Sequence, residues 1–242
     1  MITETRRIVV SGLSVQIVRK DIKNLHLGVY PPHGRVRVAA PLRVSDNAVR
    51  LAVIDKLGWI KRQQARFDAQ PRQSEREMVS GESHYFLGRR YRLRFVPFHG
   101  PAKVIVRSPG TIELHARAGL TTDQREAVLL RWYRERLKEM IPAMVEKWQD
   151  RVGVRAEEWA IRKMKTKWGA CNAQAGRIWL NLELAKKPVQ CLEYIIVHEL
   201  VHLLERRHND EFNTLMSEFL PQWKSRRAEL NAAPLAHETW SY

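Results

Sequence analysis

Two histidines and one glutamate stand at a spacing that suits metal chemistry. His198, Glu199 and His202 form the pattern HExxH. Residues four apart on a helix point the same way, so both imidazoles can reach one metal ion and Glu199 stands beside the open coordination position. The pattern predicts a zinc site in which the metal lowers the pKa of a bound water toward about 7 and Glu199 takes the proton of that water.

A catalytic zinc site needs a third protein ligand besides these two histidines. His208 is the candidate, because it follows His202 by six residues and lies in the polar run 206–210, which can end the helix and turn the chain back. Glu211 and Glu218 are the alternative ligands, since zinc also accepts carboxylates. An HExxH pattern can arise by chance as a solvated face, but the surrounding helix is apolar here, which favours metal binding.

The helices that must position these residues can be read from the periodicity of apolar positions. A helix is expected to open at Pro188, since proline suits the first helical position, and its apolar face comprises Leu192, Ile196, Leu200 and Leu203. A last helix is expected over residues 210–231, with Pro221 as a kink. The tail after Ala232 carries no such pattern.

Two short strands are expected before the metal helix, at residues 158–161 and 178–181, with a loop between them. We expect the second strand to be a free sheet edge. A peptide could pair with that edge and present its carbonyl group to the metal.

Several residues of the intervening loop have two interpretations. Cys171 is expected to be a buried thiol, since a fourth protein ligand would close the site to water. Lys165 and Lys167 either bind an anionic group of the substrate or form a solvated surface. Trp168 is expected to pack against the core.

The first half of the chain reads mainly as strands and turns. Turn residues occur at 31–34, at Gly88 and at Pro109-Gly110. The extended segments that they separate are 1–18, 25–30, 36–38, 83–98 and 104–115.

Two further helices are expected outside the metal region. After Ser45, one buried helical face comprises Val49, Val53, Leu57 and Ile60, and residues 68–81, with Pro71, read as a linker. Thr121 and Gln124 have the spacing of a capping box. They open a long helix that runs toward Val152, in which Pro142 either kinks or restarts the helix.

These elements predict an α+β fold with two regions. Residues 1–120 form a β-rich N-terminal region with one packed helix. Residues 121–242 form a zincin-like metallohydrolase domain around the HExxH helix. No internal repeat is visible in the sequence.

Charge and composition limit the partners and the compartment. The chain carries 42 Lys and Arg against 26 Asp and Glu, a net charge of +16. Such an excess attracts polyanions, so nucleic-acid contact stands beside the simpler view that the charge keeps the protein soluble. No apolar stretch approaches the roughly 20 residues that cross a bilayer, and there is no signal-peptide pattern. With only two cysteines, a soluble cytoplasmic protein is expected.

Several blocks of the sequence resemble a known family. Residues 164–171, 178–181 and 194–203, together with His208 and Phe212, resemble the YgjP-like family of metal-dependent hydrolases, relatives of SprT-like proteases. Residues 34–38 with Pro41, and 85–88 with Tyr91, are similar to the N-terminal blocks of the family.

The resemblance implies a zinc site of His198, His202 and His208, with Glu199 as the catalytic acid and base. Three loop positions depart from the family pattern, which leads us to expect Arg, Ser and Ser where this chain has Lys167, Ala170 and Asn172. The departures concern the loop and not the metal ligands.

Three functions remain open from the sequence. The leading one is a zinc peptidase that acts on a peptide or protein. A second keeps the metal but hydrolyses a nucleotide or another phosphoanhydride, although phosphohydrolases favour carboxylate-rich or paired metal sites. The third is a nucleic-acid-binding protein that acts on DNA-associated proteins, which the SprT-like relatives suggest.

Overall fold

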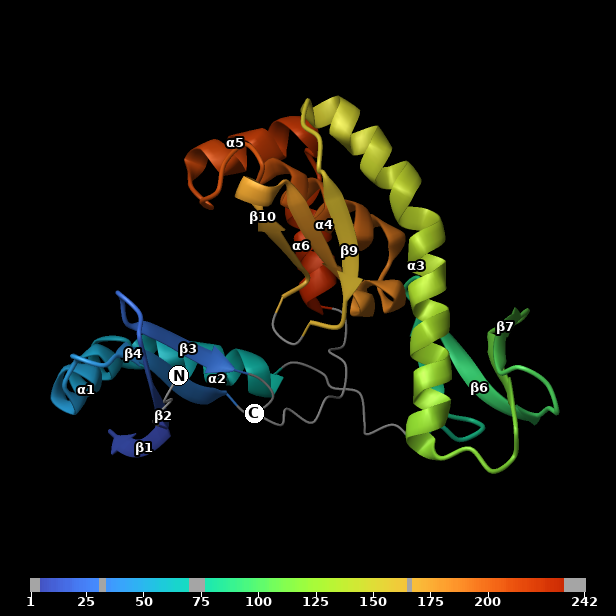
Figure 1. Ribbon diagram of the computed structural model, residues 1–242, viewed down its shortest axis with the longest axis horizontal. Coiled ribbons are helices and arrows are strands. Elements are labelled where there is room, and N and C mark those ends of the chain that lie inside the picture. The colour runs from blue at the N-terminus through green and yellow to red at the C-terminus, as the bar shows by residue number, and fades with distance from the viewer. Residues whose placement is uncertain (1–4, 31–33, 70–76, 165–166, 233–242) are drawn as a thin grey trace. The chain divides into compact units, whose positions relative to one another are not determined.

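The computed structural model describes residues 5–30, 34–69, 77–164 and 167–232. They form two compact units, one that covers the described residues up to 69 and one that covers those from 77 to 232 (Figure 1). The division falls within the segment 68–81 that was expected to be a linker, of which Pro71 lies outside the described residues. It does not fall at 120/121, because residues 77–116 share one hydrophobic core with the helices that follow them.

The first unit is a four-stranded sheet with two helices. The strands lie in the order β1-β2-β4-β3, with β2 and β4 parallel and the outer pairs antiparallel. Alternate residues of the strands, among them Val15 and Val38, are buried against Val49, Val53 and Ile60 of the helices. The elements are β1 Thr5–Val10, β2 Leu13–Lys20, β3 His26–Tyr30, β4 Arg35–Pro41, α1 Asp46–Asp55 and α2 Leu57–Ala69.

The single helix expected after Ser45 is in fact two helices, because the chain breaks between α1 and α2 at Lys56. Ser45 is the N-cap of α1, and its side chain accepts a hydrogen bond from the Ala48 N–H at 3.2 Å. Val53 and Ile60 lie on either side of the break and enter the same core. The apolar periodicity therefore continues across the break and does not reveal it.

The second unit begins with a sheet of the same topology as the first. Its order is β5-β6-β8-β7, again with a parallel central pair and antiparallel outer pairs. The elements are β5 Ser83–Phe86, β6 Arg89–Pro97, β7 Lys103–Arg107 and β8 Thr111–Ala116. The chain thus contains a structural repeat that the sequence does not show, since only alternation and turn residues are shared.

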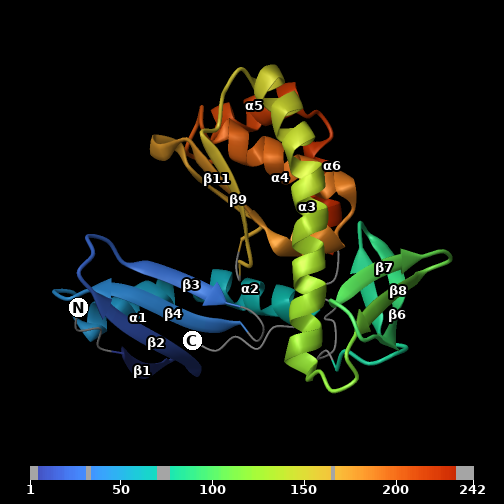
Figure 2. The same ribbon diagram turned by 45° about the vertical axis from the view of Figure 1, so that its right-hand side comes forward.

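A long helix, α3 Thr122–Val152, connects this sheet to the rest of the second unit. Thr121 and Gln124 form the expected capping box, and the helix continues through Pro142. Figure 1 shows the helix bending in its upper half. Figure 2 shows the helix running along the unit, and it packs on β7 and β8 at one end and on the helix α4 (Val189–Val201) further along. It therefore connects this sheet to α4.

Three short strands form a second sheet in this unit. They are β9 Glu158–Arg162, β10 Gly169–Asn172 and β11 Arg177–Asn181, in the order β10-β11-β9. The expectation of a loop at 169–172 and of a free sheet edge at 178–181 is wrong. β11 is the central strand, paired with β9 on one side and β10 on the other, and β10 is an edge strand.

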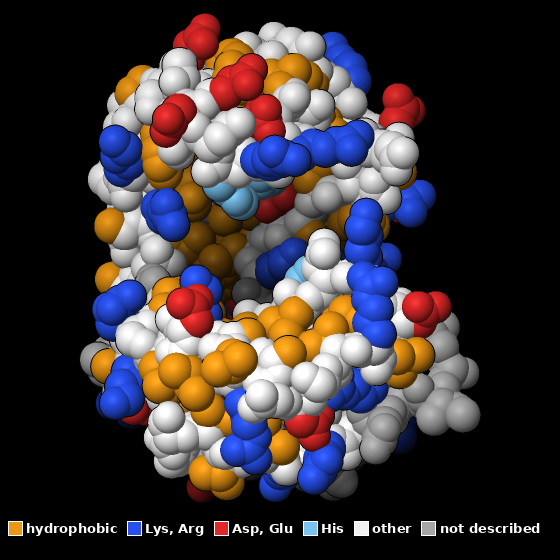
Figure 3. Space-filling model, turned by 90° about the vertical axis from the view of Figure 1, so that its left-hand side faces the viewer, with side chains coloured by type: hydrophobic (Ala, Val, Ile, Leu, Met, Phe, Trp, Pro, Cys, Tyr) orange, Lys and Arg blue, Asp and Glu red, His pale blue; other side chains and the backbone are white. Residues whose placement is uncertain are grey.

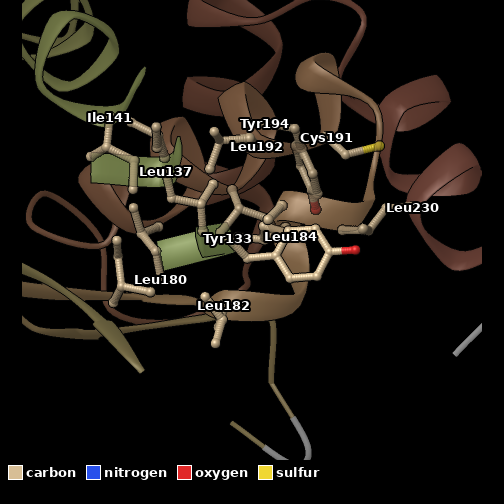
Figure 4. Close-up of a cluster of buried hydrophobic side chains, with 14 of the residues drawn as sticks. Tyr133, Leu137, Ile141, Leu180, Leu182, Leu184, Cys191, Leu192, Tyr194 and Leu230 are labelled. Atoms are coloured by element: carbon tan, nitrogen blue, oxygen red, sulfur yellow. The ribbon is translucent and has the colours of Figure 1, made fainter. Parts of the chain in front are cut away.

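The helices of the C-terminal part surround a dense core. They are α4 Val189–Val201, α5 Asp210–Phe219 and α6 Trp223–Ala232, preceded by a short 3-10 turn at Leu182–Lys186. Pro188 is the N-cap of α4 and not its first residue, and the expected helix 210–231 ends at Phe219 and resumes after Pro221. Figure 4 shows side chains of α3, β11, α4 and α6 meeting in this core: Tyr133, Leu137, Ile141, Leu180, Leu192, Tyr194 and Leu230.

The mixed composition of helices and several sheets confirms the expected α+β class. Among the described helices, none has the length and apolar character needed to cross a membrane.

Candidate metal centre

The apolar helix α4 places His198 and Glu199 next to the core. Glu199 is 4% exposed, whereas the His198 side chain is only half-buried. The helix ends at Val201, but His202 keeps a helical backbone conformation as its C-cap. The four-residue spacing therefore still directs both imidazoles to one side.

A turn after His202 brings His208 back to the same point. Asn209 caps α5, and its side chain accepts a hydrogen bond from the Phe212 N–H at 2.9 Å. This cap, one residue after His208, fixes the start of α5 at Asp210. The Nε2 atom of His208 lies 3.0 Å from Nε2 of His198 and 3.1 Å from Nε2 of His202.

These three nitrogens fit a metal ion. One nitrogen from each imidazole lies within 4.8 Å of the others, so the three converge on a common point. Ligand atoms held tetrahedrally at about 2.0–2.1 Å from zinc stand roughly 3.3 Å apart, close to the spacing found here. Three histidines leave a fourth tetrahedral position open, as a catalytic site requires.

The imidazoles of this group are prepared to act as ligands. The Nδ1 atom of His202 lies 3.0 Å from the Glu205 carbonyl oxygen, which favours the tautomer with the proton on Nδ1 and leaves Nε2 free to bind. Burial, followed by the fields of His202 and His208, lowers the pKa of His198 to about 3. Burial also lowers the pKa of His208. Neutral imidazole is the form that binds a metal.

Phe212 forms an aromatic wall behind the three histidines. Its ring stacks on His202, with a centroid distance of 4.6 Å and an interplanar angle of 30°. It meets His198 and His208 edge-on at 4.9 Å and 4.8 Å. Because Phe212 is 2% exposed, its ring holds the imidazoles from the core side.

The carboxyl group of Glu199 occupies a tight space between α4 and β10. A Cβ added to Gly169 would collide with this carboxyl group, so a side chain at the start of β10 would require Glu199 to shift. Burial raises the pKa of Glu199 to about 8, and the charge of Lys167 acts in the opposite direction. Glu199 thus combines desolvation with one nearby cation, a combination found at functional sites.

Asn181 holds the loop around Lys167 in place through hydrogen bonds. Its side-chain Nδ2 donates to the Met164 carbonyl at 2.8 Å and to the Lys167 carbonyl at 2.7 Å. Its Oδ1 accepts from the Glu183 N–H at 3.2 Å, and its own N–H donates to the Trp168 carbonyl at 2.9 Å. Asn181 is 4% exposed, and its hydrogen bonds hold the chain both before the loop, at Met164, and after it, at Lys167 and Trp168.

The other candidate residues lie apart from the three histidines. Glu211 and Glu218 are exposed on α5 and are not members of the group. Cys171 is partly exposed and not fully buried as expected, and it does not join the group either. Trp168 packs on the core as expected, under the Lys187 ammonium at 5.2 Å from the ring centre. Lys165 lies outside the described residues.

Three residues of the site were not singled out for these roles by the sequence reasoning. Gly169, Asn181 and Phe212 appeared there only as parts of motifs or apolar faces. A glycine directly before a strand can signal close approach of another group, and an asparagine at a strand end can signal a loop anchor. Neither signal names the partner, which lies 30 residues away for Gly169 and 14 residues away for Asn181.

The histidine group reaches the molecular surface. Figure 3 shows histidine side chains exposed in the upper part of the view, with Lys and Arg side chains and one acidic side chain beside them. Within the second unit, the His208 side chain is exposed and those of His198 and His202 are partly exposed.

Comparisons with known proteins add a family. The family model described as YgjP-like, metallopeptidase domain, matches residues 23–233. Among solved structures, the chain is similar to the metallopeptidase zymogen abylysin of Pyrococcus abyssi, with 22% identity and a TM-score of 0.34 over 36% of this chain and 89% of that one. No curated protein matches the chain.

Proposed function

Because the chain belongs to the YgjP-like family of metallopeptidase domains, we propose that it is a zincin-like, zinc-dependent peptidase. The metal is held by His198, His202 and His208, and Glu199 is the catalytic base. The observation that carries the proposal is the convergence of three imidazole nitrogens beside a buried carboxyl group. When bound, zinc supplies a Lewis acid and lowers the pKa of water toward about 7.

Glu199 moves the proton in this reaction. As the water oxygen forms a bond to the carbonyl carbon, its proton passes to the Glu199 carboxylate and the C=O electron pair shifts to the carbonyl oxygen. When the C–N bond breaks, Glu199 returns the proton to the leaving nitrogen. Burial raises the pKa of Glu199 and so favours the protonated form that gives its proton to the leaving nitrogen, and the positive charge of Lys167 favours the ionised form needed at the start.

The edge strand β10 supplies a place for the peptide. Among the described strands it pairs only with β11, and it lies against α4. An extended substrate pairing with the open side of β10 would pass beside Glu199, since Gly169 touches that carboxyl group. Neighbouring backbone N–H groups of a strand point to opposite sides, one toward the paired strand and the next toward the open edge. Of the two variants Ala170→Pro and Cys171→Pro, one therefore removes an N–H donor that faces the open edge. The other removes an N–H donor that pairs with β11. The first should raise KM for a peptide without loss of zinc, and the second should lower stability.

The ligand set favours a peptide over a phosphoanhydride. Three histidines suit a single zinc, whereas phosphoanhydride hydrolysis usually uses carboxylate-rich or paired metal sites.

Described residues 5–69 carry thirteen Lys and Arg against four Asp, so nucleic-acid contact stays a prediction for the first unit. Binding to a DNA duplex that falls steeply with salt would support that contact.

The experiment that tests the peptidase proposal compares three full-length proteins after zinc loading, with denatured, fluorescently labelled casein as substrate. Glu199→Gln keeps the shape of the side chain but cannot take a proton, so hydrolysis should fall by about 10²- to 10⁴-fold while the zinc content stays unchanged. Glu218→Gln is the matched control, since Glu218 is exposed on α5. Equal hydrolysis by all three proteins, or hydrolysis of nucleoside triphosphates alone, would contradict the proposal.

A further inference from the structure

The four-stranded sheet of the second unit has one face on the core and one face on solvent. Leu93, Ile112 and Leu114 are at most 2% exposed and lie in the same core as the buried residues of α3. Figures 1 and 2 both show α3 on one side of this sheet and no described element of the second unit on the other. Side chains alternate along a strand, so the sequence neighbours of the core residues form the opposite side of the sheet, the open face.

The open face is strongly basic. The strand register places Arg92 beside Thr111 and Arg94 beside Glu113 on this face. Five of its residues are exposed cations: Arg90, Arg92, Arg94, Lys103 and Arg107. Glu113 is its one acidic residue among the strand positions, and it is only 3% exposed. The face therefore presents positive charge to solvent and very little negative charge.

Glu113 holds two of these arginines in place. Arg94 from β6 forms an ion pair with one carboxylate oxygen, and Arg107 from β7 lies 3.3 Å from the other. The two arginine side chains nevertheless remain 63% and 58% exposed. A guanidinium has five N–H donors, so each arginine keeps donors for a second anion. Two ordered guanidinium groups that face solvent suit the recognition of phosphate.

Tyr85 adds an aromatic side chain to the open face. It lies on β5 opposite Arg90 in the register and is partly exposed. Its neighbours point to the core side, where His84 is 4% exposed and Phe86 packs against the core. An aromatic ring beside a cation offers a stacking surface for a base and a contact for the adjoining phosphate.

We propose that the open face binds single-stranded nucleic acid, with its five cations on phosphates and Tyr85 stacked on a base. A single strand offers phosphates and unstacked bases together, whereas a duplex keeps the faces of its bases inside the stack. None of these residues belongs to the group of three histidines, so binding should not require a metal.

The test measures the binding of a fluorescently labelled oligouridylate to the full chain by anisotropy, at salt concentrations from about 50 to 200 mM. The double variant Arg90→Gln, Lys103→Gln removes two cations that are not ion-paired with Glu113. Each phosphate contact contributes roughly 0.7 to the slope of log affinity against log salt for a single strand. The slope should therefore become shallower by about 1.4, and the affinity at low salt should fall by about tenfold or more.

The matched control is the double variant Arg131→Gln, Lys224→Gln, which removes the same charge from exposed positions of α3 and α6. It should bind the oligouridylate like the wild type. Equal losses in the two double variants would show that the affinity follows net charge alone, and would overturn the site. A wild type that does not bind the oligouridylate at about 50 mM salt would overturn it as well.

Tyr85→Leu separates stacking from charge. It should weaken binding of the oligouridylate by about fivefold or more and leave the salt slope unchanged, because stacking neutralises no phosphate. Binding of a DNA duplex of the same length should not respond to this variant, and the melting temperature checks that the variant is folded. Unchanged binding of the oligouridylate, or an equal loss with the duplex, would contradict a stacked single strand. A loss of binding to phosphatidylserine vesicles in Arg90→Gln, Lys103→Gln, with binding of the oligouridylate intact, would assign the face to a membrane and overturn the proposal.

Discussion

Gly169 lies so close to Glu199 that a single added methyl group would strike the carboxyl group. The two residues come from different elements, the edge strand β10 and the helix α4. The position of the proposed base therefore depends on the absence of a side chain thirty residues earlier in the chain. Because Gly169 contacts Glu199 and is not a proposed metal ligand, a change at Gly169 can test the position of Glu199 without removing a ligand.

Gly169→Ala should displace Glu199 while the three histidines keep their metal. A misplacement of about 1 Å at a reacting group costs roughly 10²-fold in rate, so we expect a loss of that size in kcat with a normal zinc content. Gly119→Ala is the control, since an added Cβ there meets nothing within 4 Å. Full activity in Gly169→Ala would show that the contact does not position the base.

Phe212→Leu should weaken zinc binding. The ring contacts all three imidazoles, and a smaller aliphatic side chain leaves them free to turn away from the metal. Groups that support metal ligands typically contribute about 10-fold or more to affinity, which a competition assay with a chromophoric chelator can measure. Phe219→Leu on the same helix should bind zinc like the wild type, and a similar loss in both variants would speak against a specific role of the ring.

The convergence of the three histidines was predictable from the sequence because it depends on local geometry. Four-residue spacing on an apolar helix fixes His198 and His202, and the polar run 206–210, which holds His208 six residues after His202, limits where His208 can lie. The capping box at Thr121 is local in the same way.

The features that the sequence did not reveal depend on contacts between distant segments. Residues 169–172 show no clear alternation, and β10 forms only because β11 pairs with it. For the same reason β11 was expected at an edge, although it is central. The structural repeat of the two four-stranded sheets is likewise a matter of strand pairing. Nothing in the apolar pattern of a strand states which neighbour it will have.

Asn181→Ala should destabilise the protein and loosen the loop before β10. The amide is buried and makes hydrogen bonds with Met164, Lys167 and Glu183. Their loss should cost about 2–3 kcal/mol in the free energy of unfolding, measured by urea denaturation. Asn172→Ala, which removes an exposed cap, should cost well under half of that. A stability equal to the wild type in Asn181→Ala would remove the assigned role of the amide.

Glu113 should make the second unit sensitive to acid. Hydrogen bonds from His115 and from Arg107 and Arg94 on the neighbouring strands lower its pKa from 4.5 to about 2, against an opposing effect of burial. A carboxyl group whose pKa is lowered by folding contributes stability above its unfolded pKa, and this stability is lost as the pH falls toward the folded value.

The corresponding measurement is urea denaturation of Glu113→Gln between pH 7 and pH 2. The variant should be less stable than the wild type at pH 7, and the difference should shrink as the pH falls below about 4.5. Glu139→Gln, an exposed residue of α3, should show no such trend. A difference that does not change with pH would mean that the ionised form of Glu113 is not the stabilising one.

The most direct test of the account is the metal content of the purified, untagged chain, measured by elemental analysis beside His198→Ala and Glu199→Gln. We predict about one zinc per chain in the wild type and in Glu199→Gln, and almost none in His198→Ala. A wild type that holds no metal even after zinc is supplied, or a His198→Ala variant that holds as much as the wild type, would contradict the three-histidine centre.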